Sequence, residues 1–315
     1  MQRNDTGSAI VKILIVGGTG MIGGHAAGHL VAEGHDVTLA ARKPAPAGTP
    51  MASMPTITGD YTKGDFGEAD LAPFDAIVFA AGNDIRHIPK DADPAIFWQA
   101  TQIGGVPDFV ARAKRAGVKR VVQLGSYYHQ VMPHLADTDA YVRARKLADE
   151  GARAHATADF NVTTLNPPSI VGAIRGIPAK RYETLTRWAK GELPEVPDFA
   201  PAGGTNYMSV LSLCEAISGA LRNGESGKAY LIGDQNLTFR DFFQMIFDVV
   251  GHGRTIEERD QEHPMLPDAF IVPGRGNILA YEPDPAETAL LGYRRNDVRR
   301  SVEEVVSLVG GEASA

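Results

Sequence analysis

The feature that most constrains the fold is a glycine-rich turn directly after a short apolar run. Residues 11–16, VKILIV, form the run, and residues 17–24, GGTGMIGG, form the turn. A continuous apolar run is typical of a parallel strand covered on both faces, and the spacing of apolar residues over 21–34 predicts a helix. Glycine recurs at every third position from Gly17 to Gly23. These glycines let the backbone turn tightly, so that a pyrophosphate can approach the helix N-terminus.

Apolar runs alternate with helical patterns through the first half of the chain. This alternation predicts an α/β fold with a Rossmann-type, doubly wound parallel sheet. After Asn166, proline and glycine become frequent and the helical patterns shorten, which indicates a smaller, mixed substrate-binding domain. The predicted dinucleotide-binding domain is 1–166, with a return segment near 205–233, and 167–315 is mainly the substrate-binding domain. The predicted strands lie at 11–16, 36–42, 75–82, 118–126, 160–169 and 227–233. The predicted long helices lie at 95–117, which Pro107 would kink or split, and at 140–156.

The composition limits the class of protein. The chain has 315 residues and a net charge of −7, which argues against nucleic acid or an anionic membrane as a partner. No apolar run approaches the roughly 20 residues of a membrane span, and the first residues lack an apolar signal-peptide core. We therefore expect a cytoplasmic protein with a small-molecule substrate. One cysteine, Cys214, excludes an internal disulfide and a cysteine-based metal site, and no metal is expected.

The end of the second predicted strand bears on which dinucleotide binds. Ala40 and Ala41 occupy the place of a carboxylate that would bind a ribose hydroxyl, and Arg42 and Lys43 follow. A cation there accommodates a 2′-phosphate, so NADP(H) is preferred and NAD(H) is the alternative. In the other interpretation, these two cations belong to a solvated loop. The candidate cofactor-binding residues are Gly17, Thr19, Gly20, Met21, Ile22, Gly23, Arg42, Lys43, Asp60 (for the adenine amino group), Ala80, Ala81, Gly82, Lys146, Pro167 and Ser169.

These segments together resemble the extended short-chain dehydrogenase/reductase family, which includes NAD(P)-dependent epimerase/dehydratase-like proteins. The resemblance covers nearly the whole chain. GGTGMIG at 17–23 resembles the nucleotide turn of the family, and GVKRVVQLGS at 117–126 resembles the strand that ends in its catalytic serine. NPPSIVG at 166–172 resembles the loop that flanks the nicotinamide. The resemblance implies that Ser126 is the catalytic serine and Tyr141 the working tyrosine.

The tyrosine segment departs from the family pattern Y-x-x-x-K. This chain has Tyr141-Val-Arg-Ala-Arg145, and Lys146 follows one position late. Tyr141 and Arg145 lie on one helical face, whereas Lys146 is rotated by a further 100° or so. We expect Tyr141 to act as the acid–base group, Arg145 to stabilise its anion and Ser126 to orient the substrate oxygen. In the alternative interpretation, Tyr141 is an ordinary buried tyrosine.

Other polar and aromatic residues follow the strand that carries Ser126. Ligands of open α/β sheets lie at such strand ends, between the sheet and the smaller domain. Tyr128 and His129 are second candidates for the acid, since a histidine can donate a proton near neutral pH. Trp188 would also suit the wall of a pocket for an apolar or aromatic substrate. The candidate substrate-binding residues are Tyr127, Tyr128, His129 and Tyr207.

Three functions are compatible with this pattern. The first is an NADP(H)-dependent oxidoreductase that interconverts a carbonyl and a secondary alcohol on a small substrate. The second is a nucleotide-sugar epimerase or dehydratase that retains NAD, as the resemblance implies. The third is a non-catalytic NADP(H)-binding regulatory protein, which the changed Y-x-x-x-K pattern favours. The helices at 95–116 and 140–157 also resemble those of a family dimer interface, so a homodimer is allowed.

Overall fold

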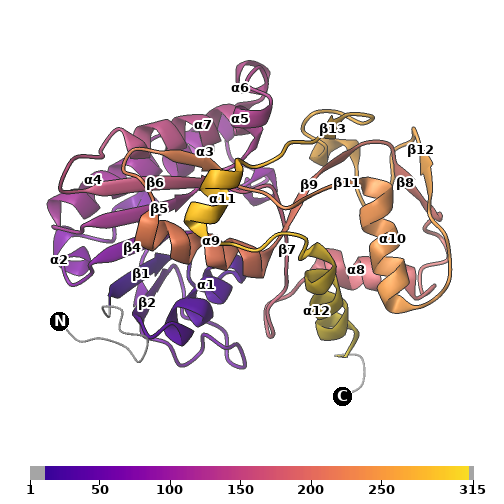
Figure 1. The fold of residues 1–315 in the computed structure, drawn as a ribbon, viewed down its shortest axis with the longest axis horizontal. Coiled ribbons are helices and arrows are strands. Elements are labelled where there is room, and N and C mark those ends of the chain that lie inside the picture. Colours follow the sequence, from indigo (N-terminus) through magenta and orange to yellow (C-terminus); the bar gives the residue numbers. More distant parts are fainter. Residues whose placement is uncertain (1–10, 312–315) are drawn as a thin grey trace. The chain divides into compact units, whose positions relative to one another are not determined.

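The structure is a computed structural model that describes residues 11–311. The chain divides into two compact units, whose elements are labelled in Figure 1. Among residues 11–311, no helix combines the length and the apolar character that crossing a bilayer requires. The first unit comprises the described residues up to Pro167 with Leu213–Ile232 and Asp284–Tyr293, and the second comprises Pro168–Ser212, Gly233–Pro283 and the residues from Arg294 onward.

The first unit is built on a seven-stranded sheet in which every neighbouring pair is parallel. This confirms the predicted Rossmann-type α/β fold and the predicted strand at 227–233, which forms β10 beside β6. The apolar runs form strands that are covered on both faces, as expected of a parallel sheet. The strands, in order across the sheet, are β10 (Ala229–Leu231), β6 (Asn161–Asn166), β5 (Arg120–Leu124), β4 (Ala76–Phe79), β1 (Lys12–Val16), β2 (Asp36–Ala41) and β3 (Thr56–Thr58).

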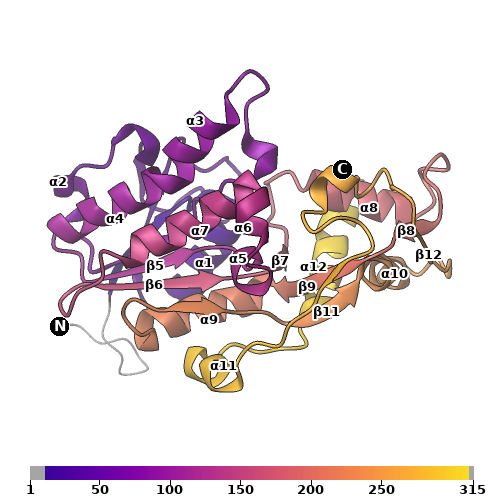
Figure 2. The ribbon, with the colours of Figure 1, turned by 90° about the horizontal axis from the view of Figure 1, so that it is seen from above.

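Helices cover both faces of this sheet (Figures 1 and 2). Leu14 and Val16 of β1 join a hydrophobic cluster with Phe109 and Ala148 on one face. The cluster lies under α2 (Glu68–Leu71), α4 (Gly105–Arg115) and α7 (Ala140–Arg153), whereas α1 (Met21–Ala32) and α9 (Val210–Asn223) lie on the other face. Short helices complete the unit: η1 (Tyr61–Lys63), η2 (Ile85–His87), α5 (Tyr128–Val131), α6 (Leu135–Thr138) and α11 (Pro285–Leu291).

The helix predicted over 95–117 is interrupted before Pro107. It consists of α3 (Pro94–Trp98), a π-helical turn η3 (Gln99–Ile103) and α4. The Gly104 N–H donates to the carbonyl oxygen of Gln99, five residues back, at 2.9 Å. Pro107 lies in the first turn of α4, where its missing N–H would have no intrahelical acceptor in any case. The interruption is therefore a π-turn, and proline follows it.

The second unit contains short strands packed on helices, with little of the periodicity that predicts strands. The helices are α8 (Lys180–Ala189), η4 (Asp268–Phe270), α10 (Phe239–Val250) and α12 (Val298–Gly310). The strands are β7 (Ser169–Val171), β9 (Gly204–Ser209), β11 (Gln235–Thr238) and β13 (Ile278–Leu279) in one sheet, and β8 (Phe199–Pro201) and β12 (Glu257–Arg259) in another. The chain re-enters the first unit at Leu213, after β9, and again at Asp284–Tyr293, a return that the sequence did not indicate.

A fully buried histidine lies in the core of the second unit. The His263 Nε2–H donates to the carbonyl oxygen of Pro197 at 3.1 Å, and Nδ1 accepts from the Met265 N–H at 3.1 Å. Its ring packs against those of Trp188 and Phe199 at centroid distances of 5.0 and 4.8 Å. Both nitrogens are thus satisfied in the neutral form. Burial lowers the pKa of His263 below the ordinary value for histidine.

We expect His263 to make the second unit sensitive to acid. Because its folded-state pKa lies below the unfolded value of about 6.5, its contribution is complete above that pH and is lost as the pH falls further. Urea unfolding of the wild type and of His263→Gln should therefore give a stability difference that shrinks below about pH 6.5. A difference that stays constant from pH 8 to pH 5 would contradict this assignment.

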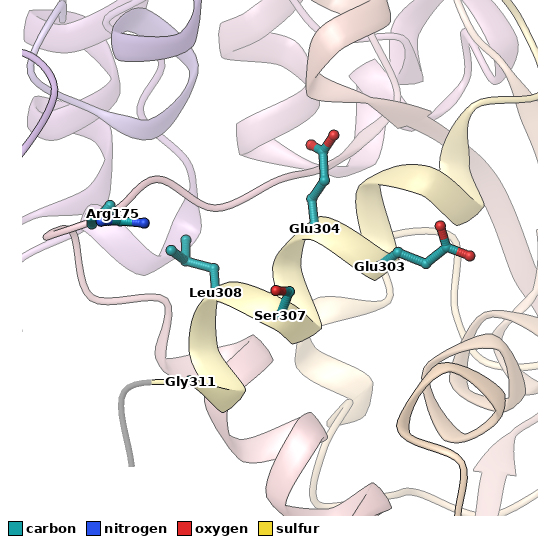
Figure 3. A pocket seen from close by; sticks show the side chains of 6 residues that line it. All are labelled: Arg175, Glu303, Glu304, Ser307, Leu308 and Gly311. Atoms are coloured by element: carbon teal, nitrogen blue, oxygen red, sulfur yellow. The ribbon is translucent and has the colours of Figure 1, made fainter. Parts of the chain in front are cut away.

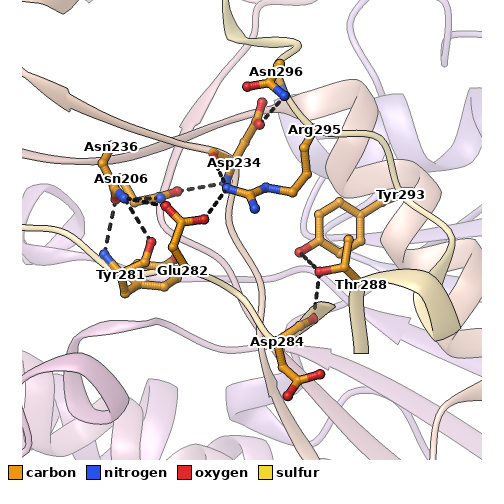
Figure 4. A network of polar contacts seen from close by, with 10 residues as sticks. All are labelled: Asn206, Asp234, Asn236, Tyr281, Glu282, Asp284, Thr288, Tyr293, Arg295 and Asn296. Atoms are coloured by element: carbon orange, nitrogen blue, oxygen red, sulfur yellow. Dashed lines mark hydrogen bonds and ion pairs between the residues drawn. The ribbon is translucent and has the colours of Figure 1, made fainter. Parts of the chain in front are cut away.

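A polar network ties together segments of the second unit that are far apart in sequence (Figure 4). Asp234, which is 1% exposed, accepts the backbone N–H of Asn296 and, at 2.9 Å, that of Asp297. Asn296 has a positive φ of 64°, which is uncommon for a residue other than glycine. The Asp234 N–H donates to Asn206 Oδ1 at 2.8 Å. One carboxylate thus holds the strained turn that precedes α12.

Replacing Asp234 by alanine is expected to lower the free energy of unfolding by about 2–4 kcal/mol. The substitution leaves the buried N–H of Asp297 and the partly buried N–H of Asn296 without an acceptor, and a buried N–H left in this way costs about 1–3 kcal/mol. Urea denaturation measures the change. Glu258→Ala, at an exposed position of β12, is the matched control and should stay within about 0.5 kcal/mol of the wild type. An equal effect of the two substitutions would show that Asp234 does not hold the turn.

Candidate active site

The glycine turn between β1 and α1 has no room for side chains at Gly17 and Gly23. Gly17 has a positive φ of 81°, and a Cβ there would lie 2.8 Å from the Ala81 backbone nitrogen. A Cβ at Gly23 would lie 2.3 Å from the Gly17 carbonyl oxygen. The tight turn and its close approach to the end of β4 therefore require glycine at these two positions.

The N-terminus of α1 is open to a ligand. Its N-cap residue, Gly20, has an extended backbone and supplies no side-chain cap. A Cβ at Gly20 would meet only the Gly17 carbonyl oxygen, at 3.4 Å. In the first turn of a helix, N–H groups such as those of Met21 and Ile22 have no intrahelical acceptor. These groups and the positive end of the helix dipole fit the pyrophosphate of a dinucleotide, and Thr19 lies in the same turn.

The end of β2 lies beside this turn, because the Gly17 N–H donates to the Ala40 carbonyl oxygen at 2.8 Å. Arg42 and Lys43 follow the strand and are exposed. In the part of the chain that the structure describes, neither cation has a hydrogen-bonding or ion-pair partner for its side chain. Two unpaired cations suit a 2′-phosphate. The preference for NADP(H) stays a prediction.

Four further cofactor candidates, from two segments, lie at the same edge of the sheet. Residues 80–82 follow β4, and the Ala80 N–H donates to the Val16 carbonyl oxygen at 2.8 Å, which places them beside the glycine turn. Asp60 caps η1, since its Oδ1 accepts from the Thr62 N–H at 3.0 Å and from the Thr62 hydroxyl at 2.7 Å. A contact of Asp60 with an adenine amino group is thus left to its other oxygen and stays a prediction.

Tyr141 lies in the first turn of α7 with its ring held and its hydroxyl unbonded. The helix begins where Asp139 Oδ1 accepts the Val142 N–H at 2.8 Å. The Tyr141 ring lies against those of Trp98 and Tyr128, at centroid distances of 5.5 and 6.1 Å. Its hydroxyl makes no hydrogen bond with any of the described residues. A phenol in this state is available to a substrate oxygen.

Arg145 lies one helical turn after Tyr141 and is 7% exposed. Its Nη2 donates to the carbonyl oxygen of Leu124 at 2.9 Å and to that of Gly125, at the end of β5. Its Nε is buried and has no partner among the described residues. Burial raises the pKa of Tyr61, and the charge of Arg145 opposes this rise. The guanidinium is therefore fixed at the strand ends, and its stabilisation of a Tyr141 anion stays a prediction.

Ser126 and Tyr127 follow β5 and are 5% and 3% exposed. The Tyr127 and Tyr128 rings lie 4.3 Å apart between centroids, and the Tyr128 ring lies 6.1 Å from that of Tyr141. Lys146 is half-buried, on a different side of α7 from Arg145. The structure thus brings Ser126, Tyr128 and the Tyr141 face of α7 to one edge of the sheet. The roles expected of them stay predictions.

The sequence reasoning missed the partners of His129. His129 Nε2 lies 3.0 Å from Asp149 Oδ2, and Asn166 Nδ2 donates to the same oxygen at 3.3 Å. The spacing in the sequence could have indicated Asp149 as part of the site, because Tyr141, Arg145 and Asp149 follow one another at intervals of four residues. Such residues lie on one helical face.

Three of the predicted residues, Ser169, Trp188 and Tyr207, belong to the second unit. Ser169 begins β7, where it pairs with Tyr207 of β9. Tyr207 is 3% exposed, and its ring stacks on Phe242 at a centroid distance of 4.2 Å. Trp188 is fully buried. Tyr207 and Trp188 are thus core residues here, rather than the exposed pocket walls that we expected, and substrate binding by Tyr207 stays a prediction. Pro167 is the last residue before this unit.

An open pocket in the second unit offers no comparable chemistry (Figure 3). Two of its carboxylates are already paired, Glu303 with Arg299 at 3.3 Å and Glu304 with Arg300 at 3.2 Å. No three His, Cys, Asp or Glu side chains between residues 11 and 311 are arranged to hold a metal. The pocket is lined by Arg175, Glu303, Glu304, Ser307, Leu308 and Gly311.

Residues 13–233 match the model of the NAD dependent epimerase/dehydratase family. The matched residues include the glycine turn, Ser126 and Tyr141. The chain therefore belongs to the NAD dependent epimerase/dehydratase family, which confirms the resemblance to extended short-chain dehydrogenase/reductases. A comparison with curated proteins gives no match.

Solved structures of similar fold extend over nearly the whole chain. The Bordetella bronchiseptica enzyme WbmG, in complex with NAD, is 16% identical with a TM-score of 0.71 and covers 96% of this chain and 95% of its own. WbmF of the same organism, with NAD⁺, is 14% identical with a TM-score of 0.73, at 97% and 94% coverage. UDP-glucose 4-epimerase of Thermotoga maritima, with UDP-glucose, is 16% identical with a TM-score of 0.68, at 96% and 100% coverage. These likenesses establish the fold.

Proposed function

We propose that this protein is an NAD(P)-dependent epimerase or dehydratase that acts on a hydroxylated substrate of the nucleotide-sugar class. The observation that carries the proposal is Tyr141, whose ring is held by Trp98 and Tyr128 while its hydroxyl makes no hydrogen bond with the described residues. The family match and the nucleotide-sugar enzymes among the structural neighbours favour this function over simple carbonyl reduction.

In this proposal, different residues bind the cofactor, transfer the proton and orient the substrate. The α1 N-terminus, with Met21 and Ile22, binds the pyrophosphate of the dinucleotide. When bound, the nicotinamide supplies the hydride acceptor and donor for the carbinol carbon of the substrate. The Tyr141 anion takes the proton from the substrate hydroxyl at its phenolic oxygen, and the resulting neutral phenol returns that proton when the carbonyl is reduced again. Ser126 donates a hydrogen bond that orients the substrate oxygen, and Arg145 favours the tyrosine anion by its charge.

A specific observation favours a second function, the NADPH-dependent reduction of a small ketone or aldehyde. Arg42 and Lys43 stand unpaired after β2 among the described residues, in the place where a 2′-phosphate would lie. Enzymes that consume NADPH stoichiometrically must bind and release it in each turnover. An epimerase instead returns its cofactor to the starting oxidation state.

Another observation favours the third function, non-catalytic NADP(H) binding. Arg145 stands where the family has lysine, and its Nη2 is committed to two backbone carbonyls. An arginine does not readily pass a proton on. If this function is correct, the protein binds the dinucleotide at the glycine turn without turnover of either substrate class.

The test begins with the nucleotide that co-purifies with the protein. The purified protein is denatured, and the released NAD(H) or NADP(H) is identified by chromatography. Nucleotide sugars are then supplied without added cofactor, and ketones and aldehydes with NADPH. Conversion of a nucleotide sugar without net change at 340 nm supports the proposal. NADPH consumption with carbonyls alone supports the reductase, and binding without any turnover supports the regulatory protein.

Arg42→Ala is expected to discriminate between the two dinucleotides. If Arg42 binds the 2′-phosphate, loss of a charged hydrogen bond worth about 1.5–3 kcal/mol should weaken NADP(H) binding roughly 10- to 150-fold. NAD(H) binding should stay within about twofold, which titration calorimetry can measure. Lys119→Ala, at an exposed position just before β5 and so at the opposite edge of the sheet, is the control. Equal losses for both dinucleotides would contradict a role in 2′-phosphate recognition.

A further inference from the structure

A buried polar network below Tyr141 centres on Asp149. Asp149 is 0% exposed, and side chains from three elements, α5, α7 and β6, bind its carboxylate. His129 Nε2 and Asn166 Nδ2 lie 3.0 and 3.3 Å from Oδ2, and Arg153 Nε donates to Oδ1 at 2.6 Å. Although burial opposes the charge, bonds from His129 and Arg153 lower the pKa of Asp149 to about 2. The carboxylate is thus ionised and can only accept, so the proton of a neutral His129 lies on Nε2.

The same network reaches the backbone at the end of β5. Asn166 Nδ2 also donates to Gln130 Oε1 at 2.7 Å. A Cβ on Gly125 would lie 1.8 Å from Asn166 Oδ1, so the amide oxygen packs directly against the glycine backbone. From the other side, Arg145 donates to the Gly125 carbonyl oxygen. Gly125 is therefore held between a side chain of α7 and a side chain of β6.

These hydrogen bonds and packing contacts lie on either side of Ser126 and Tyr128, two of the candidate active-site residues. Before Ser126, the chain is held at residues 124–125 by Arg145 and Asn166. After Tyr128, it is held at residues 129–130 by Asp149 and Asn166. Residues 126–128 lie between these two sets of contacts. Asp149 and Arg145 lie on the same face of α7 as Tyr141, so one helix face controls both Tyr141 and the segment opposite it.

We propose that Asp149 is a positioning residue, which acts through His129 and Asn166 to hold Ser126 and Tyr128 in register with Tyr141. The inference rests on the proposed function for its catalytic readout. Stability alone is a weak reason for such a network, because buried ion pairs contribute little net stability compared with apolar residues of similar volume. The network is also separate in the chain from the glycine turn, so it should not determine cofactor affinity.

The first test compares Asp149→Asn with Glu150→Gln, its exposed neighbour on α7. We expect Asp149→Asn to lower kcat about 100-fold, as misplacement of reacting groups by about 1 Å does, with cofactor affinity within about twofold. Hydrogen exchange should become faster in residues 124–131 and stay unchanged in residues 17–32. If Asp149→Asn shows the same hydrogen exchange and the same kcat as Glu150→Gln, the proposal is wrong. Exchange is measurable without any substrate, so it decides the positioning role even if the proposed enzymatic function fails.

A second pair of variants applies if Asp149→Asn does not fold. The glutamine in His129→Gln carries an amide N–H about where Nε2–H lies, whereas His129→Leu keeps volume only. If Asp149 positions the segment through His129, then His129→Gln should retain near wild-type kcat and slow hydrogen exchange in residues 124–131. His129→Leu should lose both. If His129→Gln is as inactive as His129→Leu while its exchange stays slow, His129 transfers protons itself and the proposal is wrong. If both variants match the wild type, it is also wrong.

Discussion

Replacing Tyr141 by phenylalanine is expected to lower turnover by roughly 10²–10⁴-fold, the range typical of a positioned acid–base group. The substitution removes one oxygen and keeps the ring, so the contacts with Trp98 and Tyr128 persist. The hydroxyl makes no hydrogen bond with the described residues, so its loss leaves no buried partner unsatisfied. Steady-state kinetics on the substrate found by the nucleotide-sugar and carbonyl panels measures the change.

Cofactor affinity and thermal unfolding serve as internal controls for Tyr141→Phe. Both should match the wild type, since the Tyr141 hydroxyl makes no hydrogen bond with the described residues. A loss of activity smaller than about tenfold would mean that the proton is handled elsewhere. Tyr128 and His129 are then the next residues to replace, because they follow the same strand end.

Gly23→Ala is expected to abolish dinucleotide binding. The added Cβ would lie 2.3 Å from the Gly17 carbonyl oxygen, a backbone atom that cannot move without opening the turn. The first turn of α1 would then no longer present its N–H groups to a pyrophosphate. Titration with NADP(H) and NAD(H) should show a loss of at least about 100-fold for both, in contrast to the selective loss at Arg42.

Gly28→Ala provides the matched control on the same helix. A Cβ at Gly28 meets nothing within 4 Å. Because alanine favours helix by about 1 kcal/mol over glycine, this variant should bind both dinucleotides normally and unfold at a slightly higher temperature. If Gly23→Ala binds them equally well, the turn is not the dinucleotide site.

The long helix predicted before β5 shows where local patterns mislead. Pro107 indicated a kink or a break, yet the helix α4 continues past it and the interruption lies at residues 99–103 instead. A Cβ at Gly105 would lie 2.0 Å from the Ala100 carbonyl oxygen, so the π-turn depends on glycine. The Thr101 carbonyl oxygen accepts the Tyr61 hydroxyl at 2.7 Å, a partner 40 residues earlier in the chain. The residues next to Thr101 in the sequence give no indication of such a long-range hydrogen bond.

The second unit was predictable only in outline. The sequence indicated only shorter helices after Asn166, and α8, α10 and α12 lie in that part of the chain. Several of its strands have two or three residues, too short for an alternating pattern to be recognised. The return of residues 284–293 to the first unit depends on contacts with distant segments, such as the Lys228–Glu287 ion pair at 3.0 Å.

The sequence by itself determined the glycine turn, the parallel sheet and the family, because each depends on local residue patterns: apolar runs, helical spacing and glycine where no side chain fits. Only the tertiary structure decided what the buried polar groups do. Arg145 donates to the carbonyls that end β5, and Asp149 binds His129, 20 residues earlier, and Asn166, 17 residues later. Such partners are chosen by packing, since a buried charge must be satisfied by whatever the fold brings within reach.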